Sequence, residues 1–149
     1  MRKTAKTFSF FAAGASGIVA ANLFLRLYGI VSAYLTDVGA ISWINLLPKS
    51  LSKLAFWLHY FFFEMFVLLI VILTIGSIIG FFLRINKLIA SIIAFSLYLI
   101  TKSYYIYSIH DELSYVFSPV VYFAIISTST FLLFWIGFYF GELIHKKFR

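Results

Sequence analysis

The stretch LHYFFFEMFVLLIV, Leu58 to Val71, places one carboxylate, that of Glu64, in the middle of an aromatic and aliphatic run. The apolar character continues on both sides, from about Leu54 to Leu83, beyond the roughly 20 residues that a helix needs to cross the hydrocarbon core of a membrane. A charged side chain in hydrocarbon costs on the order of 2.5 kcal/mol or more, so it is normally paired, hydrated or functional. The stretch therefore predicts a transmembrane helix whose Glu64 meets a cationic residue of another helix.

The composition of the whole chain favours the same class. Of its 149 residues, 63% are hydrophobic and only 11% are charged, a balance that a soluble domain of this length could not keep inside. We therefore expect a single membrane domain over residues 1–149 and no separate soluble domain. The absence of cysteine excludes disulfides and thiolate metal sites. The formal net charge of +7 comes from short basic clusters between apolar runs, so we expect no nucleic-acid partner.

Four apolar runs predict an all-α fold of four transmembrane helices packed as a compact bundle. The expected helices cover about residues 8–35, 54–83, 88–107 and 117–141. The N-terminal segment resembles a signal peptide, with a basic start, an apolar run and small residues near Ala20, and we expect it to be retained as a signal anchor that forms the first span. In the first outer loop, ISWINLLP (41–48) predicts a short interfacial helix, unless it extends the second span.

The distribution of Lys and Arg predicts how the bundle is oriented. With four crossings, eight of these residues fall on one side of the membrane and two on the opposite side. The eight are Arg2, Lys3, Lys6, Arg84, Lys87, Lys146, Lys147 and Arg149, and the two are Lys49 and Lys53. By the positive-inside rule, we expect both termini in the cytoplasm and a multi-pass protein of the inner (plasma) membrane.

Each expected helix carries small residues spaced by about one turn. They are Ala13, Gly17 and Ala21 in the first helix, Gly76 and Gly80 in the second, Ala90 and Ala94 in the third, and Gly137 and Gly141 in the fourth. Because lipid tails are as apolar as leucine, membrane helices associate through close backbone approach and polar contacts. We expect these residues to pack helices within one chain, with a contact to another subunit as the open alternative.

Charged residues of three helices fall in the outer half of the bundle. Counting about 1.5 Å per residue from the cytoplasmic end of each helix puts Arg26 and Glu64 at the same depth, with Lys102 somewhat lower. We therefore expect a bidentate ion pair between Arg26 and Glu64, which the long side chain of Lys102 can extend outward to join.

Polar and aromatic residues surround this charged group. Asn22, His59, Tyr98 and Tyr105 lie in the same outer half by the same count. One interpretation is an aromatic-walled pocket in which Arg26 and Lys102 hold the phosphate of a lipid head group. The other, which we favour, is a belt of interfacial tyrosines beside a satisfied ion pair. A third alternative is a small proton-coupled transporter in which Glu64 carries the proton.

Enzymatic chemistry finds little support in the sequence. It contains no HExxH, P-loop or Gly-rich nucleotide motif. His110, Asp111 and Glu112 are adjacent in the third loop, but adjacent residues seldom converge on one metal ion, so we expect a solvated turn. We expect no catalytic residue, no metal site and no cofactor.

Two segments, FSFFAAGASGIVAANLFL (8–25) and GFFLRINK (80–87), together with the four-span size, resemble the GtrA-like proteins. That family is implicated in moving polyprenyl-linked sugars across bacterial membranes. The resemblance implies a carrier or flippase for a lipid-linked, polyprenyl phosphate substrate. The first outer loop is longer than in that family, and the carrier is kept as an alternative.

The sequence as a whole predicts a small non-enzymatic membrane protein that acts by binding. We expect it to serve as a subunit of a larger membrane complex or as a protein-recognition module. The expected partners are membrane lipids and, within the membrane, another protein or further copies of this chain.

Overall fold

In the computed structural model, residues 2–37, 42–106 and 119–148 are described, and all regular structure in these ranges is helical. The four main helices are α1 (Arg2–Asp37), α2 (Lys49–Phe82), α3 (Lys87–Ile106) and α4 (Pro119–Lys147). A short 3-10 helix, Ser42–Leu46, precedes α2. Over the described ranges, the predicted all-helical fold with four main helices is confirmed.

Three helical segments of the described chain are long and apolar enough to cross a membrane. They are Thr4–Tyr34, Phe61–Phe82 and Phe123–Lys147. The chain is therefore a membrane protein, as its composition predicts. The remaining helix, α3, has 20 residues and extends about 30 Å, which is close to the thickness of a hydrocarbon core.

Three of the helices extend beyond the apolar runs of the sequence, since α4 also continues past Gly141 to Lys147. α1 begins at Arg2 and α2 begins at Lys49, several residues before each apolar run. Pro48 sets the start of α2, because its extended backbone (φ −52°, ψ 144°) precedes the first turn, where a proline removes no helical hydrogen bond. Its carbonyl accepts hydrogen bonds from the backbone N–H groups of Leu51 (2.9 Å) and Ser52 (2.8 Å).

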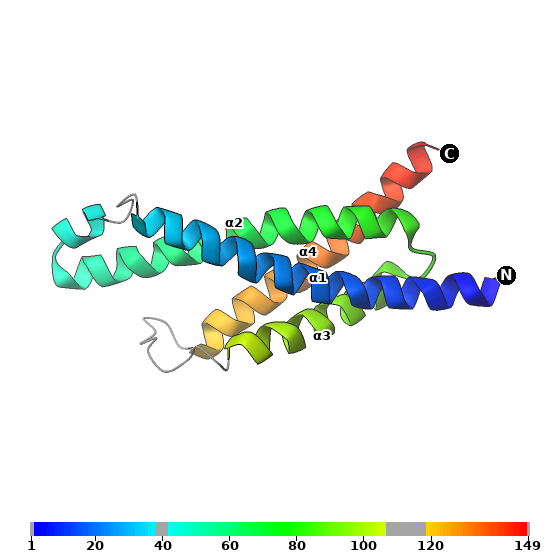
Figure 1. Ribbon diagram of the computed structural model, residues 1–149, viewed down its shortest axis with the longest axis horizontal. Coiled ribbons are helices and arrows are strands. Elements are labelled where there is room, and N and C mark those ends of the chain that lie inside the picture. Colours follow the sequence, from blue (N-terminus) through cyan, green and yellow to red (C-terminus); the bar gives the residue numbers. More distant parts are fainter. Residues whose placement is uncertain (1, 38–41, 107–118, 149) are drawn as a thin grey trace.

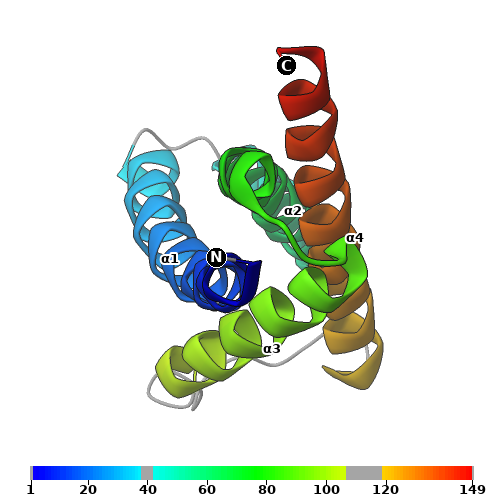
Figure 2. The same ribbon diagram turned by 90° about the vertical axis from the view of Figure 1, so that its right-hand side faces the viewer.

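The four helices surround a shared interior. Viewed along the long axis, α1, α2, α4 and α3 follow one another around the bundle (Figure 2). The start of α1, the end of α4 and the turn between α2 and α3 lie at the same end of the bundle (Figure 1). We call it the basic end, defined by Lys6, Arg84, Lys87, Lys146 and Lys147.

Glycines bring α2 and α4 into close contact. A methyl group added to Gly76 would lie 3.1 Å from the Cα of Gly137. One turn further along α2, a methyl group on Gly80 would lie 2.6 Å from the Cα of Phe138, which is too close for any side chain. Only glycine allows the two backbones to approach in this way, as in other membrane helix pairs.

α1 and α3 form a second close pair. Gly17 lies against the backbone carbonyl of Ala94, and a methyl group on Gly14 would lie 2.9 Å from Cδ1 of Leu97. Ala13 and Ala21 are also fully buried in this part of α1. The contacts of α1 with α2, and of α3 with α4, are sparser. The bundle therefore consists of two tightly packed pairs, α1–α3 and α2–α4.

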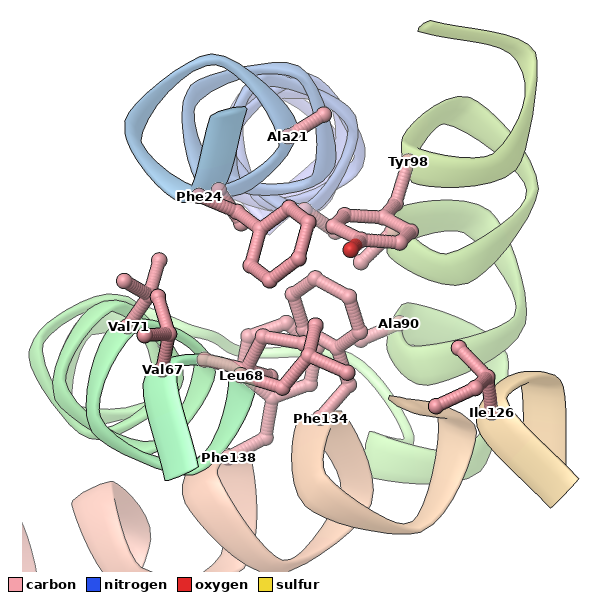
Figure 3. Packing of buried hydrophobic residues seen from close by; sticks show 14 of the residues in the cluster. Ala21, Phe24, Val67, Leu68, Val71, Ala90, Tyr98, Ile126, Phe134 and Phe138 are labelled. Carbon is pink, nitrogen blue, oxygen red and sulfur yellow. The ribbon is translucent and has the colours of Figure 1, made fainter. Parts of the chain in front are cut away.

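Side chains from all four helices fill the interior between the two pairs. Phe24 of α1, Leu68 of α2, Tyr98 of α3 and Phe134 of α4 converge there (Figure 3). The Tyr98 ring packs edge-on against the Phe134 ring, with centroids 6.1 Å apart and planes at 71°. These rings form a tightly packed layer in the interior of the bundle.

Replacing Gly80 with alanine is expected to destabilise the bundle, because the added methyl group would meet the backbone of α4 rather than a movable side chain. Overpacking of this kind costs about 1–3 kcal/mol, so the variant should unfold at a lower temperature in detergent.

The matched control is Gly29→Ala. A methyl group on Gly29, in α1, would meet nothing within 4 Å, and alanine favours the helix by about 1 kcal/mol relative to glycine. Equal unfolding temperatures for the two variants would contradict the close α2–α4 approach.

Candidate functional site: a buried ion pair

An ion pair lies inside the bundle, between Glu64 of α2 and Lys102 of α3. Lys102 Nζ donates a hydrogen bond to Glu64 Oε1 over 2.6 Å. Glu64 is 6% exposed and Lys102 is 9% exposed. Since α2 belongs to one tight helix pair and α3 to the other, this contact links the two halves of the bundle.

Aromatic rings complete the surroundings of the Lys102 ammonium. Its Nζ lies 4.7 Å from the centroid of the Phe24 ring and 6.0 Å from that of Tyr98. The Phe24 ring is in turn stacked on Tyr28, with centroids 5.5 Å apart. A ring face attracts a cation through its negative quadrupole, most strongly where water is excluded. The positive charge is therefore stabilised by one carboxylate and by two rings.

Helical spacing explains why both charged side chains point inward. In α3, Lys102 continues a stripe of buried residues four apart, Ala90, Ala94 and Tyr98. In α2, Glu64 precedes the buried residues Val67, Leu68, Val71 and Ile72 at helical spacing. Residues three or four apart share one face of a helix, so both charges lie on the faces that form the interior.

The expected ion pair between Arg26 and Glu64 is not the one that the structure contains. The Glu64 carboxylate is paired with Lys102, and the Arg26 side chain is exposed. The buried residue of this part of α1 is Phe24, and a residue two positions further points about 200° away around a helix. Equal depth in the membrane therefore does not identify the partner of Glu64, because the face of the helix from which a side chain projects also matters. The four-residue spacing of Ala90, Ala94, Tyr98 and Lys102 is the feature of the sequence that indicates an inward-facing Lys102.

Of the other residues expected near the pair, the structure places Tyr98 beside it, with its ring centroid 6.0 Å from Lys102 Nζ. The side-chain amide of Asn22 donates a hydrogen bond to the Ile18 carbonyl of its own helix (2.9 Å). His59 is half-buried on α2, and Tyr98 is fully buried in the core. The side chain of Tyr105 lies outside the described part of the structure. So does the whole predicted turn at 110–112.

Two hydroxyl groups are buried in the interior without a hydrogen bond to the described residues. The hydroxyl of Tyr98, one helical turn before Lys102, has no hydrogen-bond partner within the described residues, and neither has that of Thr130 in α4. Both residues are 0% exposed. Buried polar groups in folded proteins are normally hydrogen-bonded. The interior therefore has unused hydrogen-bonding capacity, and the Tyr98 hydroxyl belongs to a ring that lies beside the ion pair.

A second charged group lies at the basic end. Glu142 of α4 contacts Lys146 at 2.9 Å and Lys87 at 3.7 Å. Lys87 Nζ also donates a hydrogen bond to the Leu83 carbonyl (2.8 Å). Partial burial lowers the pKa of Lys87, the first residue of α3 and just before the apolar run that begins at Leu88, while the Glu142 carboxylate acts in the opposite direction. This group ties the start of α3 to the end of α4.

Within the described residues, no three His, Asp or Glu side chains are grouped so that they could hold a metal ion. Comparisons of the chain with protein-family models, with curated proteins and with solved structures gave no match. The resemblance to GtrA-like proteins gains no support from them.

Breaking the ion pair from one side is expected to destabilise the fold more than removing both charges. Glu64→Gln leaves the Lys102 ammonium buried without its counter-charge, and such losses cost about 3–5 kcal/mol. The double variant Glu64→Gln with Lys102→Met removes that unpaired charge, so it should unfold at a higher temperature than Glu64→Gln alone. Thermal unfolding in detergent, analysed as a double-mutant cycle, measures the coupling.

Arg26→Met provides the control for this cycle. Arg26 is exposed, so its substitution should leave the effect of Glu64→Gln unchanged. Additive effects of the Glu64 and Lys102 substitutions, or coupling to Arg26 instead, would show that the pair does not form.

Proposed function

We propose that this chain is a four-span integral membrane protein without enzymatic activity, which acts by binding another membrane protein. It would serve as a subunit of a larger assembly or as a recognition module, in the inner membrane. Both termini would be cytoplasmic. The length of α3 supports a fourth crossing, and the shared position of the two chain ends supports an even number of crossings. The excess of cations at that end supports its cytoplasmic location.

The observation that carries the binding role is an open groove between α2 and α4, with a volume of about 430 Å³. It is lined by Phe62, Met65, Phe66, Leu69, Ser129, Leu132 and Leu133. Phe62 and Phe66 are 66% and 61% exposed. Within a membrane, helices recognise one another through shape, because their apolar surfaces resemble the lipid around them. The groove, with its aromatic side chains and the hydroxyl group of Ser129, has a shape that a helix of a partner protein could fit.

The four glycines of the α2–α4 contact strengthen this interpretation. Gly76, Gly80, Gly137 and Gly141 are all engaged within the chain, against backbone atoms of the facing helix. They are therefore not offered to a second subunit. The groove, which lies between the same two helices, is a more suitable surface for a partner.

Filling the groove tests this function. Ser129→Trp should place an indole among the groove side chains and prevent a partner from entering, whereas Ile78→Trp enlarges a residue of α2 that does not line the groove and is already 57% exposed. Native mass spectrometry after gentle extraction should show a stoichiometric partner with the wild type and with Ile78→Trp, and its loss with Ser129→Trp. A wild-type chain that carries no protein partner, or a partner that survives Ser129→Trp, would refute this role.

The unpartnered Tyr98 hydroxyl favours a second candidate function, that of a carrier for a lipid-linked polyprenyl phosphate. In this role the Tyr98 hydroxyl and the Lys102 ammonium would hold the phosphate, and the exposed Arg26 would attract it to the bundle.

Titration with polyprenyl phosphate, followed by native mass spectrometry, tests the carrier. Arg26→Gln and Lys102→Gln should each weaken binding about ten- to hundredfold, since a hydrogen bond to a charged group contributes about 1.5–3 kcal/mol. Gly29→Ala is a control without a charge change. Affinities that do not differ between these variants and the wild type would remove this candidate.

A further inference from the structure

The two ends of the bundle differ strongly in charge. The basic end and the adjoining chain termini carry eight of the twelve Lys and Arg residues, with Glu142 as their only neighbouring carboxylate in the sequence. At the opposite end of the bundle, α1 ends with the acidic residue Asp37 and α2 begins with the basic residue Lys49. The basic end therefore has a local excess of positive charge.

Hydrogen bonds hold the α2–α3 turn against α1 at this end. The backbone N–H of Arg84 donates to Ser9 Oγ over 3.0 Å, and the Ser9 hydroxyl donates to the Ala5 carbonyl (2.9 Å). Lys6 lies three residues before Ser9, on the same side of α1. The turn that carries Arg84 is thus fixed against the part of α1 that carries Lys6, although the two residues are far apart in the sequence.

Lys6 and Arg84 differ from their neighbours in how their charge is balanced. Glu142 contacts Lys87 and Lys146, so its carboxylate is already shared by two cations. Lys6 and Arg84 are both exposed and form no ion pair with a described carboxylate. Their positive charges therefore face the surroundings of the protein.

The membrane places a particular kind of anion at this position. Arg84 follows the end of the apolar segment Phe61–Phe82 by two residues, and Lys6 lies in the first turn of the apolar segment Thr4–Tyr34. Residues at the margin of a membrane span lie at the level of the lipid head groups. Lys and Arg at this level attract anionic lipids, and the fork of an arginine can bind a phosphate through two hydrogen bonds.

We propose that Lys6 and Arg84 form a binding site for the phosphate of an anionic phospholipid at the basic end. The site is formed by α1 and the α2–α3 turn, and the Ser9–Arg84 hydrogen bond holds together the two segments that carry these cations. It lies away from the α2–α4 groove and from the Glu64–Lys102 pair, so it is independent of the proposed function.

The test compares lipid binding by charge-matched variants. The double variant Lys6→Gln with Arg84→Gln removes two positive charges from the site, and Lys49→Gln with Lys53→Gln removes two from the other end. The purified full chain in detergent is titrated with phosphatidylglycerol and, separately, with phosphatidylcholine, and bound lipids are counted by native mass spectrometry.

The wild type and the Lys49/Lys53 variant should prefer phosphatidylglycerol. The Lys6/Arg84 variant should bind it about thirtyfold more weakly, since each basic residue near the surface contributes about fivefold. Its affinity for phosphatidylcholine should not change. The charge-conserving variant Lys6→Arg with Arg84→Lys should keep the preference, and this separates loss of charge from damage to the fold. Equal losses in the two charge-neutralising variants, or no loss at the basic end, would overturn the proposal.

Discussion

The bundle depends on one buried interaction, the ion pair between Glu64 and Lys102. Either charge alone would be costly at this depth, whereas the 2.6 Å contact and the Phe24 ring stabilise both. The partners belong to different helix pairs, so the contact defines how α1–α3 sits against α2–α4. A shift of one residue along either helix would turn a charged group about 100° away from its partner. The pair therefore fixes the register of the two halves as well as neutralising their charges.

Close backbone contact supplies the cohesion within each half. Burial of apolar surface provides little net attraction between helices in lipid, so tight packing and polar contacts must replace it. Gly76 and Gly80 allow α4 to touch α2, and Gly17 allows α3 to touch α1. Hydroxyl groups on the same helices, such as those of Ser16 and Thr101, bond to carbonyls of their own helix. These hydroxyl groups are thereby hydrogen-bonded, and they do not disturb the close contacts between the helices.

Among the described residues, ion pairs lie at two levels of the bundle. At the basic end, the Ser9–Arg84 hydrogen bond and the Glu142 contacts join the turn, α1, α3 and α4. Further along the bundle, Glu64 and Lys102 form the corresponding tie in the interior. The bundle is thus held by polar contacts at two levels, with aromatic rings between them. Its outer surface, including the groove between α2 and α4, remains available to other components of the membrane.

The sequence by itself determined the class of protein, because the length and the hydrophobicity of the helices reflect the thickness of a membrane and require no knowledge of tertiary contacts. It also indicated that Glu64 needs a cation, since the cost of a charge in hydrocarbon is local. Only the tertiary structure decided that the cation is Lys102 and not Arg26, because partnership depends on which face each helix turns inward and on how the helices cross. It likewise decided that Gly76 meets Gly137, since small residues permit close approach on any helix but do not specify the partner.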